Sequence, residues 1–182
     1  MRLFAAVPLP LDVLQRFTDL RLRLATPKDG LRWSPSDQAH ITLRFLGEVS
    51  EDEALMYAES LKRLHSAPVH LAIESLGIFG AKGILYASLV SSAELGDLQA
   101  QVERCVTEHG ALPETRPFLP HLTLARSKNR TGMNTLQRLS RPGLPALGGV
   151  VRWTATEVLL YESLLSPGGA EHRVLARYPL NG

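Results

Sequence analysis

The stretch His40-Ile41-Thr42-Leu43 has the pattern histidine, aliphatic residue, threonine, leucine, and this pattern returns later in the chain as His121-Leu122-Thr123-Leu124. Side chains of a β-strand alternate between its two faces, so each histidine shares a face with the threonine two positions on. The aliphatic residues point the other way, into apolar packing. One copy of so short a pattern is weak evidence, but two copies predict a pair of strands, each with a polar site on one face and a core on the other.

The segments around the two copies repeat one order of elements. Residues 2–7 and 83–90 have strand patterns, and a helical pattern follows each of them, over 11–24 and over 91–110. Several links between strands are too short for parallel crossovers, so the sheets must be at least partly antiparallel. The sequence therefore predicts an α+β fold with two similar lobes, in a single domain that spans all 182 residues.

The remaining elements follow from capping and turn residues. Two capping boxes, Ser50 with Glu53 and Ser91 with Glu94, predict the starts of two helices. Three further strands are predicted over residues 69–76, 150–165 and 172–180. Residues 127–149 are rich in Gly, Pro, Arg and Asn, which favours a loop with one short helix near residues 135–139.

The composition is that of a folded protein without structural disulfides. The 182 residues are 45% hydrophobic and 21% charged, which suits a buried core and excludes a disordered chain. Cys105 is the only cysteine, which excludes an internal disulfide and favours a cytoplasmic protein. The net charge of +2 permits a basic cleft without requiring one. No window reaches the roughly 18 to 20 apolar residues that a membrane helix needs, so we expect a soluble protein without membrane contact. We also expect a monomer.

The paired motifs supply the groups that hydrolysis of a phosphodiester requires. The reaction needs a base for the attacking water, an acid for the departing oxygen and donors for the charged oxygens. The ordinary histidine pKa of about 6.5 allows one imidazole of the pair, His40 or His121, to start neutral and the other charged. The hydroxyls of Thr42 and Thr123 can donate hydrogen bonds to phosphate oxygens. This arrangement requires no metal or other cofactor, and the chain lacks the ligand spacings of a zinc site.

The alternative is that both motifs are ordinary strands whose histidines are buried and satisfied. Duplication at equivalent points of a repeat argues against that interpretation. The other histidines do not share the pattern, and we predict that they are surface or structural residues: His65, His70, His109 and His172.

The longer flanks of both motifs are similar to the two signatures of the 2H phosphoesterases, as seen in residues 40–47 and 117–126. Residues 2–10, 77–79 and 158–163 further resemble the RNA 2′,3′-cyclic phosphodiesterases, formerly described as 2′,5′-RNA ligases. This resemblance implies a bilobal, pseudo-symmetric fold around a central cleft. It also implies metal-independent hydrolysis of a terminal 2′,3′-cyclic phosphate to a 2′-phosphate, with RNA ends or cyclic nucleotides as substrate. His40 and His121 would then be catalytic, and Thr42 and Thr123 would bind the phosphate.

Strand alternation and the resemblance predict different arginines beside the phosphate. The resemblance implies Arg126, although strict alternation places Arg126 on the face opposite His121 unless a bulge near Ala125 turns it inward. Alternation instead favours Arg44, which would share a face with His40. Both arginines are therefore candidate substrate-binding residues.

Phe45 is a further candidate for substrate binding. It occupies the position in the first motif that corresponds to Arg126 in the second. Its ring could stack on a base or ribose, or it could pack in the core with Ile41 and Leu43, whose parity it shares. The resemblance also shows a departure: relatives often have a tyrosine shortly after the last Pro-Gly step, where this chain has Gly169-Ala170-Glu171-His172.

Two other functions remain open from the sequence. One is a non-catalytic module that binds RNA ends through basic residues such as Arg44, Arg126, Lys128 and Arg130. The other is a related phosphodiesterase, or a 2′,5′-RNA ligase, that acts on 2′,5′-linked or ADP-ribose cyclic phosphate substrates. Our mechanistic hypothesis makes His121 the base and His40 the acid, but the symmetry of the motifs does not decide between them.

Overall fold

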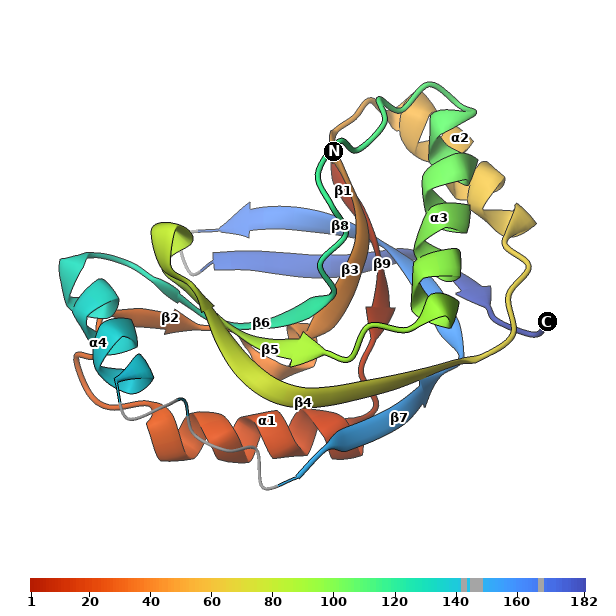
Figure 1. The fold of residues 1–182 in the computed structure, drawn as a ribbon. Coiled ribbons are helices and arrows are strands. Elements are labelled where there is room, and N and C mark those ends of the chain that lie inside the picture. Colours follow the sequence, from red (N-terminus) through yellow and green to blue (C-terminus); the bar gives the residue numbers. More distant parts are fainter. Residues whose placement is uncertain (142–143, 145–148, 167–168) are drawn as a thin grey trace.

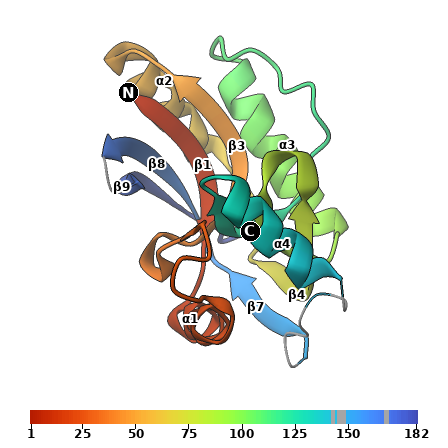
Figure 2. The ribbon, with the colours of Figure 1, turned by 90° about the vertical axis from the view of Figure 1, so that its left-hand side faces the viewer.

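The computed structural model describes residues 1–141, 144, 149–166 and 169–182. Within them the strands form two antiparallel sheets (Figures 1 and 2). The first sheet has the order β3 (His40–Glu48), β1 (Arg2–Pro8), β8 (Glu157–Ser166), β9 (Gly169–Pro179). The second has the order β2 (Leu31–Trp33), β6 (His121–Ser127), β5 (Ile84–Leu89), β4 (Val69–Phe79), β7 (Val151–Ala155). The predicted α+β class with two antiparallel sheets is confirmed.

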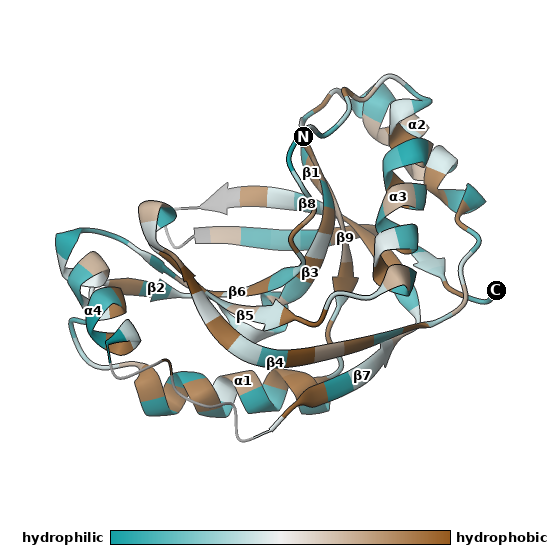
Figure 3. Cartoon of the chain, viewed as in Figure 1, coloured by the Kyte–Doolittle hydropathy of each residue, from teal (hydrophilic) through white to brown (hydrophobic). Residues whose placement is uncertain are grey.

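The described residues form four α-helices that pack beside the sheets: α1 (Leu11–Leu24), α2 (Glu51–Ser60), α3 (Ala93–Thr107) and α4 (Arg130–Ser140). Single 3-10 turns lie at Ser36–Gln38, Leu61–Arg63 and Gly80–Lys82. Helices α2 and α3 pack on each other, and α3 contacts both β3 and β4, so it joins the two sheets (Figure 1). Hydrophobic and hydrophilic residues alternate along α1 and α3 (Figure 3), and the buried ones recur at helical spacing, as Val13, Phe17 and Leu20 do in α1. None of the described helices combines the length and apolar character needed to cross a membrane.

The two sheets are built alike, and this places the motif strands. The order β3-β1-β8-β9 corresponds to β6-β5-β4-β7, with β2 added at the free edge of β6. The motif strands β3 and β6 therefore hold equivalent places, and they also contact each other across the gap between the sheets. The internal repeat in the sequence thus becomes a pseudo-twofold arrangement with one motif on each side.

The short helix predicted near residues 135–139 is confirmed as part of α4, but α4 begins at Arg130 and has 11 residues, so the first part of the loop predicted around it was wrong. Asn129 acts as the N-cap because its side chain accepts a hydrogen bond from the amide of Gly132. Gly132 lets the helix approach the backbone of Gly30 closely, since a Cβ at position 132 would lie 2.3 Å from the carbonyl oxygen of Gly30. The composition of this segment suggested that its asparagine and glycine residues would interrupt a helix, whereas Asn129 caps α4 and Gly132 lets it pack closely. The part of the predicted loop at 142–143 and 145–148 lies outside the described residues.

Three boundaries also differ from the sequence predictions. The long strand expected at 150–165 is divided into β7 and β8, which belong to different sheets. The N-cap of α3 is Ser92 rather than Ser91, and the carboxylate of Glu94 accepts a hydrogen bond from the amide of His70 instead of closing a capping box. The last strand begins at Gly169, before the predicted start at His172. The capping box of Ser50 and Glu53 is confirmed.

Candidate active site

Both motif histidines are held by the same local hydrogen bond. The Nδ1 of His40 lies 2.7 Å from the carbonyl oxygen of Gln38, and the Nδ1 of His121 lies 2.7 Å from the carbonyl oxygen of Leu119. A carbonyl oxygen only accepts hydrogen bonds, so Nδ1 carries the proton and donates it in both cases. Because Nδ1 makes this hydrogen bond, Nε2 is the nitrogen through which each imidazole can exchange a proton with a ligand.

The two imidazoles face a common region between β3 and β6. Burial lowers the pKa of His40 to about 4, against the hydrogen bond to Gln38, which raises it. Electrostatic interactions with His172, His121 and Arg126 lower the pKa of His40 further. The ring of His172 on β9 lies 5.1 Å from that of His40, and β3 contacts β6, so residues from these three strands converge on one site.

A β-bulge follows the threonine in each motif. Along β3, Thr42 lies opposite Ala6 and Arg44 opposite Ala5, so Leu43 is an extra residue. Along β6, the register likewise shifts between the partners of Thr123 and Ala125, which leaves Leu124 as the extra residue. Two consecutive residues are buried at each bulge, and the alternation of faces is reversed beyond it. The bulges therefore decide which later residues face the site.

The bulge in β6 turns Arg126 to the face of His121. The sequence analysis required such a bulge near Ala125 for Arg126 to lie on the face of His121 and approach the phosphate. The positive charge of Arg126 is also one of the causes that lower the pKa of His40. Partial burial, together with the charge of Arg32, lowers the pKa of Arg126 itself.

The prediction that Arg44 shares the face of His40 was wrong, because the bulge at Leu43 turns it into the interior. Only 8% of the Arg44 side chain is exposed, and its Nε lies 2.5 Å from the Glu103 carboxylate on α3. Its guanidinium also donates to the carbonyl oxygens of Phe45 and Leu112. Arg44 thus joins β3 to α3 and to the segment after α3, and it lies away from the candidate site.

The same bulge places Phe45 on the face of His40, so core packing of Phe45 is excluded. Phe45 lies opposite Phe4 in the β1–β3 pair, and 37% of it is exposed. The guanidinium of Arg2 lies 5.0 Å from the centre of the Phe45 ring. Phe45 and Arg126 hold equivalent positions in the two halves of the site, one aromatic and one cationic.

Aromatic rings from neighbouring strands surround His40. The ring of Phe4 on β1 lies 4.7 Å from that of His40, and the ring of Tyr161 on β8 lies 5.8 Å from it. Phe4 and Tyr161 also stack on each other at 5.0 Å. These rings account for the burial that lowers the pKa of His40, since an apolar wall disfavours the charged imidazole.

A matching pair of rings lies beside His121. Phe79 on β4 is 5.2 Å and Tyr86 on β5 is 5.7 Å from the imidazole, and the two rings stack at 4.1 Å. Gly77 makes this stack possible, because a Cβ at position 77 would lie 2.3 Å from Cζ of Tyr86. The motif strand alone carries no signal for these rings, since in each sheet they belong to the strand beside the motif strand and to the next one beyond it.

His172 is a site residue that the sequence analysis assigned to the surface or to a structural role. Its ring lies 5.1 Å from His40 and 4.9 Å from Phe4, edge-on to both. Burial lowers the pKa of His172, and its Nδ1 is buried without a hydrogen-bond partner among the described residues. The strand β9 brings His172 here by pairing it with Ser163 of β8, which no local sequence pattern indicates.

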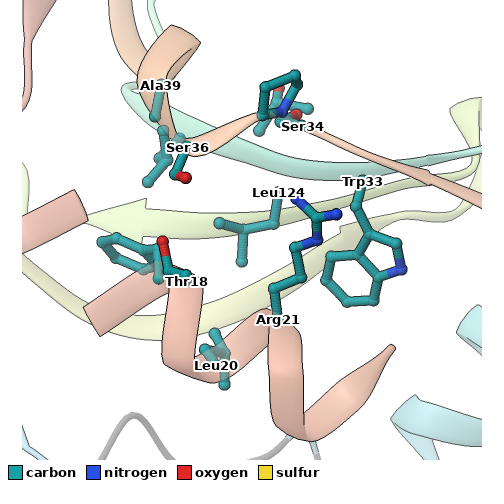
Figure 4. Close-up of a pocket in the computed structure, with 12 residues that line it drawn as sticks. Thr18, Leu20, Arg21, Trp33, Ser34, Ser36, Ala39 and Leu124 are labelled. Atoms are coloured by element: carbon teal, nitrogen blue, oxygen red, sulfur yellow. The ribbon is translucent and has the colours of Figure 1, made fainter. Parts of the chain in front are cut away.

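A separate hollow lies between α1, the segment 33–39 and β6 (Figure 4). It is lined mostly by apolar groups, among them Phe17, Trp33 and Leu124, and of the motif histidines and threonines only Thr123 borders it. The Trp33 indole, on its wall, donates a hydrogen bond of 2.9 Å to Asp29. The part of the chain that the structure describes holds no group of three or more His, Cys, Asp or Glu side chains suited to a metal ion.

The comparisons with known proteins agree with this geometry. The model of the 2′-5′ RNA ligase superfamily matches residues 9–164, which include both motifs. The chain belongs to the 2′-5′ RNA ligase superfamily. This membership confirms the resemblance to 2H phosphoesterases that the two motifs indicated.

Curated relatives in this superfamily are similar over most of the chain. A protein of Thermus thermophilus named RNA 2′,3′-cyclic phosphodiesterase is 31% identical, over 100% of this chain and 91% of its own length. One of the same name from Aeropyrum pernix is 30% identical, over 88% of this chain and 92% of its own length. A third, from Geobacillus stearothermophilus, is 29% identical over 98% of this chain, which spans 57% of the length of that relative.

Two solved structures share the fold. The crystal structure of TT0787 of Thermus thermophilus aligns with a TM-score of 0.78 at 28% identity, covering 100% of this chain and 99% of that one. The apo structure of E. coli LigT aligns with a TM-score of 0.82 at 23% identity, covering 100% and 98%. The predicted bilobal, pseudo-symmetric architecture is therefore that of the superfamily.

The environment of His40 predicts an unusual titration. Its pKa of about 4 means that the ring stays neutral, with the proton on Nδ1, where an ordinary histidine is charged. The unfolded chain takes up this proton below about pH 6.5 and the folded chain only near pH 4, so His40 lowers stability as pH falls through that window. An NMR titration of the ring nitrogens from about pH 8 to about pH 4.5 checks this, with His40→Gln to assign the signals. Half-protonation of His40 above about pH 6 would contradict the structure.

Proposed function

We propose that this protein hydrolyses the terminal 2′,3′-cyclic phosphate of RNA to a 2′-phosphomonoester. The observation that supports this most directly is the matched pair of imidazoles, each held through Nδ1 and each with a free Nε2, on the adjacent strands β3 and β6. One such group can take a proton while the other gives one, as the reaction demands. The relatives named RNA 2′,3′-cyclic phosphodiesterase support the substrate class.

In the proposed mechanism, Nε2 of His121 takes a proton from a water molecule as its oxygen attacks the phosphorus. The bond from phosphorus to the 3′ oxygen breaks, and Nε2 of protonated His40 gives its proton to that oxygen. The product keeps its phosphate on the 2′ oxygen. Because burial lowers the pKa of His40, the proton on His40 depends on the negative charge of the bound phosphate, which favours the charged imidazole.

The remaining side chains bind the substrate in this proposal. Thr42 and Thr123 share the faces of their histidines and donate hydroxyl hydrogen bonds to the non-bridging oxygens. Arg126 adds positive charge beside the phosphate. The exposed ring of Phe45 stacks on the terminal base or ribose. The scheme uses no metal and no cofactor, and we propose that the protein acts as a cytoplasmic monomer.

A substrate panel tests this function. Wild-type protein is incubated in EDTA with an RNA that ends in a 2′,3′-cyclic phosphate, a cyclic mononucleotide, a 2′,5′-linked dinucleotide and ADP-ribose cyclic phosphate. We expect turnover of the first two, with a 2′-phosphate product and no loss in EDTA. A 3′-phosphate product would show that the 2′ oxygen leaves instead. Loss of activity in EDTA would contradict metal independence, and tight, salt-dependent binding without turnover would favour an RNA-end binding module.

A further inference from the structure

The edge strand β2 places a second arginine beside Arg126. In the β2–β6 pair, Arg32 lies directly opposite Arg126, so both side chains project from the same face of the sheet. That face is the one that carries His121, because the bulge at Leu124 has reversed the alternation. Arg32 thus extends the row of candidate substrate-binding groups by one strand, about 4.8 Å further from the histidines.

Neither guanidinium has a carboxylate partner in the described part of the chain, where the ion pairs involve other cations: Arg44, Lys62, Arg63, Arg116, Arg173 and Arg177. The nearest acidic residue in the sequence, Asp29, is turned away and accepts hydrogen bonds from the Trp33 indole and the amide of Leu31. The charge of Arg32 contributes to the lowered pKa of Arg126, after partial burial. Two like charges directly opposite on paired strands destabilise a sheet unless an anion lies between them.

We propose that Arg32 binds a second phosphate group, the one on the 5′ side of the terminal nucleoside, while Arg126 lies between that group and the reactive cyclic phosphate. This inference rests on the proposed function, and it specifies the substrate as an RNA chain end rather than a cyclic mononucleotide. A guanidinium is suited to this task because its fork of donors matches two phosphate oxygens. A cyclic mononucleotide with a free 5′ hydroxyl has no phosphate for Arg32 to bind.

The test compares kcat and KM for two substrates, adenosine 2′,3′-cyclic phosphate and a dinucleotide that ends in the same cyclic phosphate. We expect Arg32→Gln to lose about tenfold in kcat/KM on the dinucleotide, mainly through KM, and less than about twofold on the mononucleotide. The salt dependence of dinucleotide binding should fall by roughly 0.7 in log–log slope, because one phosphate contact is lost. Arg32→Lys should restore part of the loss.

Arg16→Gln is the matched control, since Arg16 is an exposed residue of α1 and the charge change is the same. Equal losses on both substrates would overturn the proposal by placing Arg32 at the reactive phosphate, and no loss on either would show that Arg32 binds no phosphate. If wild-type protein hydrolysed neither substrate, the proposed function would fail separately. Binding of a fluorescent dinucleotide with a 2′-phosphate end, against the corresponding mononucleotide, would then still confirm or overturn the role of Arg32.

Discussion

Replacing His121 or His40 by alanine is expected to lower kcat for a 2′,3′-cyclic phosphate by a factor of about 10² to 10⁴ in each case. Each substitution removes one free Nε2, while the backbone hydrogen bonds of β3 and β6 remain. The double variant should be little worse than the more impaired single variant, because the two groups act in one step. Steady-state hydrolysis in EDTA measures these effects. His70→Ala, at an exposed position on β4, serves as the control and should keep wild-type activity.

A sulfur substitution separates the two roles of the histidines. When sulfur replaces the 3′ oxygen, the leaving group is a thiolate, which needs no proton because a thiol such as that of cysteine has a pKa of about 8.5, far below that of an alcohol. The variant without the acid should then recover most of its activity, whereas the variant without the base should not. Recovery is expected for His40→Ala. Recovery of His121→Ala alone would exchange the two roles, and full activity of either variant on the ordinary substrate would refute the paired mechanism.

Changing Arg126 to methionine is expected to lower activity but not stability, whereas changing Arg44 to methionine is expected to lower stability but not activity. Arg126→Met should lose about 10² to 10³ in kcat/KM, because it removes positive charge beside the developing charge of the phosphate. Its stability should change by no more than about 0.5 kcal/mol, since the side chain has no ion pair in the described structure.

Arg44→Met should instead lower the free energy of unfolding by about 3 kcal/mol and leave kcat/KM of the folded protein close to wild type. The substitution leaves the Glu103 carboxylate without its cation, and that carboxylate is only 22% exposed. Urea denaturation and initial rates, measured on both variants, test the pair. A loss of kcat in Arg44→Met at unchanged stability would show that Arg44 acts at the phosphate, as strict alternation predicted. Arg44→Met with Glu103→Leu should recover part of the stability, because it removes the unpaired charge as well.

The local sequence was sufficient to predict that each motif histidine shares a strand face with its threonine. Strand alternation over three residues places a histidine and its threonine on one face, and this depends only on the backbone of that strand. The repeat of strand, helix and motif was likewise readable, because each element has its own period of apolar residues. The first turns of helix α4 were not predicted, because composition does not distinguish the Gly132 that docks a helix from a glycine that breaks one.

The tertiary structure decided on which face of its strand each of three residues lies: Arg44, Phe45 and Arg126. A bulge is a property of two paired strands, since it arises where the partner, β1 or β5, offers one residue against two. No pattern within β3 or β6 reveals the partner, so alternation read from a single strand gives the wrong face beyond Leu43 and Leu124. The residues that complete the site come from strands distant in sequence: Phe4, Phe79, Tyr86, Tyr161, His172 and Arg32.

The sequence by itself therefore determined that each motif histidine shares a face with its threonine, because these residues need only their own strands to face one way, and the chemistry proposed for them rests on that placement. Only the tertiary structure decided the surroundings of that chemistry. Burial by neighbouring rings lowers the pKa of His40, and pairing with β2 brings Arg32 opposite Arg126. Both effects depend on distances between side chains of different strands, which exist only once the sheets have formed.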